Sequence, residues 1–105
     1  DLTLSGPSSS SGGAWASYSF TGGTSGKPFG VYWSLSNSGT VFGGHQFDLG
    51  MPVTPIGTGS VNNAGVGAAS QQIPGNVSGV TVYIEAIVNE GGSFQDSNMI
   101  TLTIN

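Results

Sequence analysis

Hydrophobic and polar residues alternate at every second position along much of this chain, whereas a helix would repeat its hydrophobic residues with a period of about 3.6. Near the start, Leu2 and Leu4 alternate with polar residues, and residues 6–13 then form a run of glycine, proline and serine. Such a run is typical of turns and loops. Two more alternating segments occupy residues 14–21 and 29–36. Each alternating segment predicts a strand with one buried face and one exposed face.

The last third of the chain shows this alternation most clearly. In residues 80–89, valine, isoleucine and alanine alternate with positions that are predicted to face outward, among them Tyr83, Glu85 and Ile87. A similar pattern occupies residues 98–105. Its inward positions are Ile100, Leu102 and Ile104.

The middle of the chain is less regular but contains no convincing helix. Short strands are possible at residues 40–43, 47–49, 56–61 and 66–71. The 19 glycines and 5 prolines interrupt every candidate helical window. We therefore predict an all-β fold. It is an antiparallel immunoglobulin-like β-sandwich of about seven to nine short strands, formed by one domain over residues 1–105.

Trp33 is predicted to be the central core residue of this sandwich. It shares its face of the predicted strand with Val31 and Leu35. In immunoglobulin-like folds a tryptophan on the third strand packs between the two sheets in this way. Tyr18 and Phe20 are also predicted to point inward, by the alternation of their own segment.

Composition excludes several classes of function. The chain has one residue of the Lys and Arg types, Lys27, and no cysteine. Nucleic-acid and phosphate sites need clustered cations, so we expect no nucleic-acid partner. No apolar run approaches the ~18 residues of a membrane-spanning helix, so we expect no membrane span. Only 6% of the residues are charged, so little repulsion keeps copies apart and self-association is physically easy.

The order of the segments resembles a known group of domains. The chain opens with LTLSGP, continues through a YWSLS strand, a DLG segment and a GTGSVNNAG turn, and closes with GVTVY and SNMITLTIN. These segments are similar to those of the small secreted β-sandwich domains at the C-terminal ends of bacterial surface and exported proteins. The resemblance implies an immunoglobulin-like fold and an extracellular or cell-surface location. It implies no catalytic residues.

Catalytic chemistry has little material in this sequence. His45 is the only histidine, and Asp48 lies nearby, so a serine nucleophile has one candidate base and one candidate carboxylate. The chain contains no Gly-x-Ser-x-Gly nucleophile elbow, however, and a glycosidase would need two carboxylates across a cleft. We therefore predict no catalytic residues, no enzymatic activity and no cofactor.

The loop around Asp96 has two interpretations, a calcium site and an ordinary turn. Asp96 and Asn98, with Glu90 before them, offer oxygen atoms around one loop. Calcium prefers about six to eight oxygen ligands, and the loop has no Asp-x-Asp-x-Asp run. The alternative, which we favour, is that Asp96 and Asn98 form a turn through their own side chains, so we predict no metal site. Residues 76–78 (Asn-Val-Ser) match an N-glycosylation acceptor and are interpreted as an ordinary loop.

The remaining aromatic residues are candidates for contact with a partner. Trp15, Tyr32 and Tyr83 fall on the outward positions of their segments. If the strands of Tyr32 and Tyr83 are neighbours, both rings lie on one solvent face near Ile87. Exposed aromatic and apolar patches generally mark contact surfaces, for sugar stacking or for subunit packing. A third interpretation is that loops of the chain itself partly cover each ring.

These observations predict an extracellular structural module that self-associates, as the repeating subunit of a bacterial surface filament or sheath. The terminal strands are candidates for pairing with, or exchange into, a neighbouring copy. Their residues are Leu2, Leu4, Ile100, Leu102 and Ile104. The alternative is a carbohydrate-binding or adhesion module that holds an extracellular polysaccharide on Trp15, Tyr32 and Tyr83.

Overall fold

The computed structural model describes residues 2–42, 45–51, 53–73, 75 and 79–105, with Phe42 and His45 described by their backbone. These residues form eleven strands and no helix, so the predicted all-β class is confirmed. None of the described residues belongs to a helix long and apolar enough to cross a membrane. The strands are β1 (Thr3–Ser5), β2 (Ser9–Ser10), β3 (Trp15–Thr21), β4 (Pro28–Ser34), β5 (Thr40–Phe42), β6 (His45–Phe47), β7 (Thr54–Ser60), β8 (Gly67–Gln72), β9 (Thr81–Asn89), β10 (Phe94–Asp96) and β11 (Ile100–Ile104).

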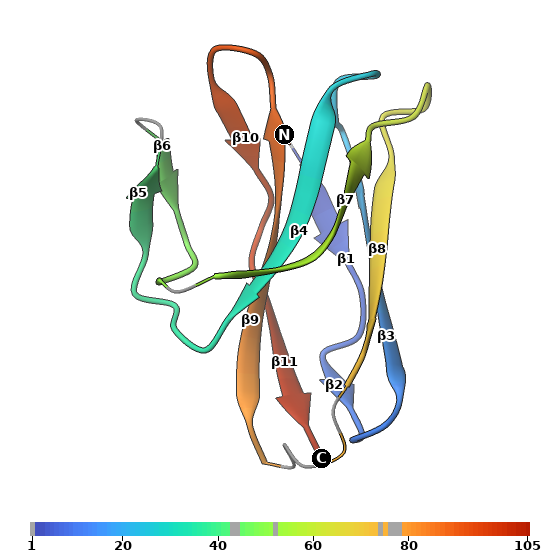
Figure 1. Ribbon diagram of the computed structural model, residues 1–105, viewed down its shortest axis with the longest axis vertical. Coiled ribbons are helices and arrows are strands. Elements are labelled where there is room, and N and C mark those ends of the chain that lie inside the picture. The colour runs from blue at the N-terminus through green and yellow to red at the C-terminus, as the bar shows by residue number, and fades with distance from the viewer. Residues whose placement is uncertain (1, 43–44, 52, 74, 76–78) are drawn as a thin grey trace.

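Most of these strands form two sheets of a β-sandwich (Figure 1). One sheet has the order β1-β3-β8, and we call it the three-stranded sheet. The other has the order β2-β11-β9-β4-β7, and we call it the five-stranded sheet. β10 continues the five-stranded sheet by pairing with the end of β9 beyond β11. All of these pairings are antiparallel except the short pairing of β2 with β11.

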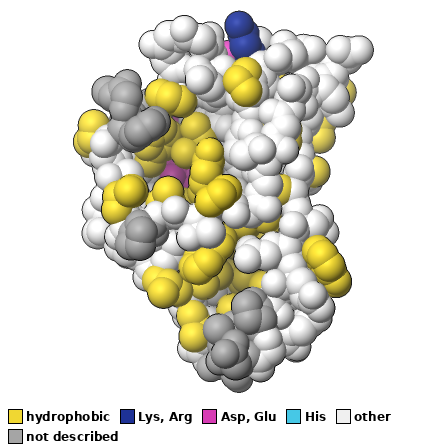
Figure 2. All heavy atoms as spheres, in the orientation of Figure 1, with side chains coloured by type: hydrophobic (Ala, Val, Ile, Leu, Met, Phe, Trp, Pro, Cys, Tyr) yellow, Lys and Arg dark blue, Asp and Glu magenta, His cyan; other side chains and the backbone are white. Residues whose placement is uncertain are grey.

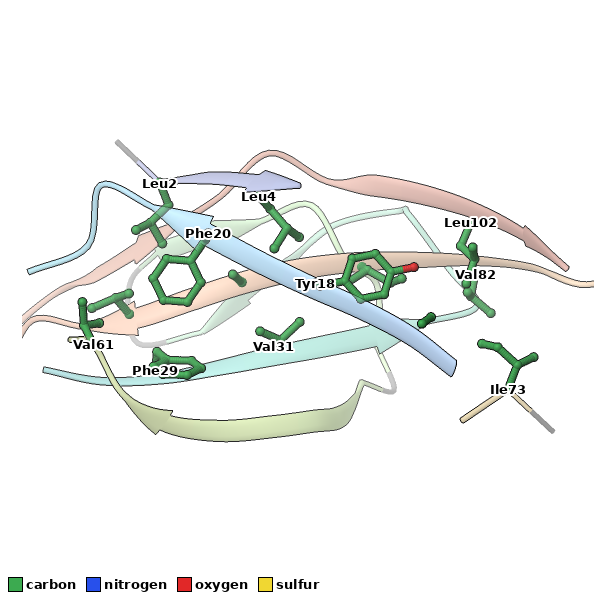
Figure 3. Packing of buried hydrophobic residues seen from close by; sticks show 14 of the residues in the cluster. Leu2, Leu4, Tyr18, Phe20, Phe29, Val31, Val61, Ile73, Val82 and Leu102 are labelled. Atoms are coloured by element: carbon green, nitrogen blue, oxygen red, sulfur yellow. The ribbon is translucent and has the colours of Figure 1, made fainter. Parts of the chain in front are cut away.

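The hydrophobic core lies between the two sheets, and the predicted alternation places its residues correctly (Figure 3). Tyr18 and Phe20 of β3 are almost fully buried against residues of the opposite sheet, among them Val31. The rings of Phe20 and Phe29 meet edge to face with centroids 5.0 Å apart. Each fully buried side chain of this kind stabilises the fold by about 1.5–3 kcal/mol. Leu2, Leu4, Leu102 and Ile104 are buried in the same core, as the pattern predicts.

The end of β4 departs from the prediction. Trp33 is only partly buried and packs at the margin of the core, while Val31 is fully buried within it, so the prediction that Trp33 is the central core residue is wrong. Leu35 is 63% exposed because β4 ends at Ser34. Ser34 is buried instead, and its hydroxyl donates a hydrogen bond to the carbonyl oxygen of Gly50 at 2.6 Å.

Two short strands lie in segments that the sequence pattern assigns to loops. β2 contains only serine and has no hydrophobic alternation, but its backbone pairs with β11. The bonds include Asn105 N to the carbonyl oxygen of Ser10, at 2.7 Å. β10 follows the Gly91-Gly92 turn and pairs with β9. Both strands pair through the backbone with a longer strand, and the short run of each lacks the alternation that identifies the longer strands.

The described residues between β4 and β7 fold over the outer face of the five-stranded sheet, and we call these residues (35–42, 45–51 and 53) the excursion. It contains the β5–β6 hairpin, which lies to the left of β4 in Figure 1. Phe47 and Leu49 of the excursion are buried but do not belong to the main core cluster. The ring of Phe47 meets that of Phe94 of β10 edge to face, with centroids 6.0 Å apart. The excursion therefore forms a second apolar cluster, outside the sandwich.

Candidate binding surfaces

A hollow of about 230 Å³ lies between the excursion and the five-stranded sheet, and we call it the outer hollow. It is mostly apolar. Its principal lining residues are Tyr32, Phe47, Leu49, Met51, Ile87 and Phe94, and Glu85 also lines it. Figure 2 shows this hollow as a group of hydrophobic side chains with an acidic side chain between them. An apolar cavity with a few polar groups is the usual form of a small-molecule site.

The register of β4 and β9 places the polar and aromatic residues of the outer hollow together. Tyr32 of β4 lies directly opposite Glu85 of β9, and Gly30 lies opposite Ile87. A Cβ atom at Gly30 would lie 2.5 Å from the hydroxyl oxygen of Tyr32, so the absence of a side chain there makes room for the ring along β4.

Glu85 is the buried acid of the outer hollow. Its side chain is 0% exposed, although the alternation along β9 predicts an outward position. Glu85 does lie on the outer face of the five-stranded sheet, as predicted, but the excursion covers it there. The Glu85 carboxyl accepts hydrogen bonds from Asp48 N at 3.2 Å and from Leu49 N at 3.4 Å. Burial, together with the neighbouring Asp96 carboxyl, raises the pKa of Glu85 to about 8, against the opposing effect of these two N–H donors.

Three carboxyl groups meet at this position. Ligand atoms of Asp48, Glu85 and Asp96 all lie within 4.8 Å of one another. Glu85 and Asp96 are also joined by a side-chain hydrogen bond. A hydrogen bond between two carboxyl groups requires one of them to be protonated, and the raised pKa of Glu85 makes Glu85 the group that holds this proton.

The structure does not bring together the three residues that the sequence offered for calcium. The side chain of Asn98 accepts from Leu4 N at 2.8 Å and donates to the Leu4 carbonyl oxygen at 3.1 Å. Glu90 accepts a hydrogen bond from the Thr24 hydroxyl at 3.0 Å. Only Asp96 takes part in the acidic cluster. The sequence analysis does not predict Glu85 as a site residue, because the alternation along its strand places it on the outer face. A single acidic residue among the apolar residues of this strand is the sequence feature that points to it.

Two other candidates fall partly or wholly outside the described residues. The structure describes the backbone of His45, which lies in β6 opposite Phe42, but it does not describe the His45 side chain. The acceptor-like tripeptide at residues 76–78 also lies outside it. Asp48 is placed by its backbone N–H, which donates to Glu85.

A second hollow, of about 210 Å³, opens between the two sheets, and we call it the open seam. β7 and β8 approach closely near Gly57, where a Cβ atom would lie 2.9 Å from the Cβ of Ala69. In Figure 1, β7 comes from the left at about mid-height and turns upward beside β8, so the lower part of β8 has no length of β7 alongside it. Core residues therefore line an opening. The principal lining residues are Trp33, Leu35, Ile56, Ile73, Ile84 and Leu102, and no charged residue is among the described residues that line it.

Trp33 gives the open seam an unused hydrogen-bond donor. Its Nε1 is buried, and within the described part of the chain it is the buried side-chain nitrogen or oxygen without a hydrogen-bond partner. A buried donor of this kind costs about 1–3 kcal/mol if nothing accepts from it. Trp33, a lining residue of the open seam, therefore carries one polar group that lacks an acceptor.

The predicted aromatic residues are divided between two faces. Tyr32, Tyr83 and Ile87 lie on the outer face of the five-stranded sheet, because β4 and β9 are neighbours as the prediction required. Trp15 is 68% exposed on β3 of the opposite sheet. The three rings therefore do not form one platform.

The terminal strand residues all pack within their own chain. Leu2, Leu4, Leu102 and Ile104 are buried in the core, and Ile100 is partly buried against it.

Comparison of the chain with protein-family models, with curated proteins and with solved structures gave no match.

Proposed function

We propose that this protein is an extracellular structural module that self-associates, as the repeating subunit of a surface filament or sheath. The open seam is the observation that carries the proposal, because it leaves core residues of the sandwich within reach of a neighbouring chain. Natural sandwiches normally cover such an opening with a strand or loop.

The strand arrangement supports an immunoglobulin-like module. β1, β3 and β8 occupy the places of strands A, B and E in one sheet of that fold. β4, β9 and β11 occupy the places of strands C, F and G in the other. Within the described residues, no strand lies between β7 and β8 to close the sandwich at the open seam.

The open seam suits an extended strand from another copy. β7 pairs with β4 and β8 pairs with β3, and among the described residues neither pairs with a strand along its other edge. A strand added to one of these edges would form backbone hydrogen bonds and place alternate side chains in the opening. Trp33, whose Nε1 lacks an acceptor, lines the same opening.

A second copy of the same chain is the partner that the charges favour. The seam lining has no charged residue among those described, and the whole chain carries a net charge of −4 with 6% charged residues. Little electrostatic repulsion therefore opposes contact between copies. If the inserted strand and the open seam are different surfaces, the contact does not close on itself and the copies form a filament.

Replacing Ile56 by lysine tests this proposal, because the Ile56 side chain lines the open seam. We expect the wild-type chain to sediment faster with increasing concentration and to form filaments visible by negative-stain microscopy. Ile56→Lys should remain a monomer, because insertion would bury its charge.

Val41→Lys is the matched control, since Val41 is 66% exposed and does not line the open seam. This variant should assemble like the wild type. A wild-type chain that stays monomeric at every concentration would overturn the proposal.

Carbohydrate binding remains the alternative prediction. Tyr32 and Tyr83 lie on one sheet face, but Trp15 lies on the other sheet. A glycan array with Tyr32→Ala and Trp15→Ala variants tests this alternative. The absence of binding by the wild type would remove it.

A further inference from the structure

The outer hollow has no part in assembly through the open seam, so its construction needs its own explanation. It is closed on one side by the five-stranded sheet and on the other by the excursion. Three aromatic rings, of Tyr32, Phe47 and Phe94, contribute to its lining. Glu85, which is buried, is part of the same lining.

Its size limits what it can hold. A protein cavity of about 150 Å³ is large enough to bind benzene. At about 230 Å³, the outer hollow has room for one ring, or a short alkyl group, with a small polar substituent. A complete oligosaccharide or peptide would not fit inside it.

The charge of the outer hollow selects the polar substituent. Glu85 lines the hollow, and ligand atoms of the Asp48, Glu85 and Asp96 carboxyl groups lie within 4.8 Å of one another. The single lysine, Lys27, is not among the described residues that line the hollow. Figure 2 shows this lysine at the top of the molecule, away from the hollow.

We propose that the outer hollow binds a small organic ammonium ion. The apolar part of the ion lies among Tyr32, Phe47 and Phe94, and its ammonium group lies at Glu85. The carboxyl groups of Asp48 and Asp96, within 4.8 Å of that of Glu85, add negative charge behind it. Aromatic faces attract cations, and carboxyl oxygens accept charge-assisted hydrogen bonds from an ammonium group. A calcium ion would need about six to eight oxygen ligands and would leave the aromatic lining unused.

Titration of the wild-type chain with three probes of similar shape tests the assignment. The probes are phenethylammonium, 2-phenylethanol and 3-phenylpropionate, which place a cation, a neutral group and an anion on the same ring. Binding is measured by calorimetry and by amide chemical-shift changes at Leu49 and Ile87. We expect phenethylammonium to bind at least about tenfold more tightly than the alcohol, and the anion not to bind.

Two variants and one control locate the binding. Glu85→Gln and Asp96→Asn should each weaken phenethylammonium binding by about tenfold, while the amide shifts elsewhere show an intact fold. Glu90→Gln is the matched control, because Glu90 does not line the outer hollow. It should leave the affinity unchanged.

Three results would overturn the proposal. The first is equal binding of the ammonium and the alcohol, which would show that the charge has no role. The second is ammonium binding that neither acidic variant weakens. The third is calcium chloride binding to the wild type and displacing phenethylammonium, which would identify a metal site. Because the comparison of probes uses the wild-type chain, it stands even if one variant fails to fold.

Discussion

Glu85 holds the excursion against the outer face of the five-stranded sheet. Its carboxyl group accepts hydrogen bonds from Asp48 N and Leu49 N, and Leu49 is buried beside it. Burying an acid is unfavourable when it is ionised, so the proton shared with Asp96 lowers the cost of this arrangement. Loss of that proton should weaken the attachment of the excursion.

The buried acid predicts a pH-dependent stability. In the folded protein the pKa of Glu85 is raised from its ordinary value of 4.5 to about 8, so the folded state holds this proton more tightly than the unfolded state. The contribution to the free energy of unfolding is complete below pH 4.5 and is lost as the pH rises to about 8. Since one pKa unit corresponds to about 1.4 kcal/mol, we expect a loss of a few kcal/mol.

Urea denaturation followed by tryptophan fluorescence across this pH range measures the loss. Glu85→Gln should flatten the dependence, because a glutamine does not ionise. The other described groups in the acidic cluster are Asp48 and Asp96, and the hydroxyl of Tyr32 lines the same hollow. An unchanged pH dependence in Glu85→Gln would show that another group is responsible.

At the scale of the elements, close packing between strands depends on small residues. Gly67 of β8 lies where the rings of Phe20 and Phe29 meet. A Cβ atom there would collide with the Phe20 ring and lie 2.9 Å from the Phe29 ring. Neither ring has space to move within a packed core, so the glycine allows the two sheets to approach.

Gly67→Ala should therefore lower the free energy of unfolding, by about 1–3 kcal/mol, because it overfills the core. Gly92→Ala is the matched control, because a Cβ atom at Gly92 would have nothing within 4 Å. We expect that control to change the stability by less than about 0.5 kcal/mol. Thermal or urea denaturation of the two variants makes the comparison, and equal stabilities would contradict it.

The sequence predicts the elements best where side-chain burial decides the structure. The alternation in β3, β9 and β11 identifies the strands and their inward faces. The alternation does not identify β2, whose serines pair only through the backbone. It gives the correct face for Glu85 but not its burial, because a segment distant in the sequence covers it. The outer hollow could not be predicted, because it forms only when the excursion meets residues of β4, β9 and β10.

At the scale of the whole molecule, the sandwich is closed in one half and open in the other. The close approach of Gly57 and Ala69 joins the sheets above the open seam, whereas Trp33, Ile56 and Ile84 line the opening below. The low charge of the chain leaves this apolar opening without electrostatic protection against other copies. The central claim is that a second copy fills it.

Nuclear magnetic resonance on a mixed sample of isotope-labelled and unlabelled chains tests that claim most directly. The probe is the indole N–H of Trp33, which is buried without an acceptor in the isolated chain. If a strand of a second copy enters the open seam, this proton shows contacts to protons of the unlabelled chains, and Ile56→Lys abolishes them. Contacts that come only from the same chain, in samples where assembly is visible, would contradict the account.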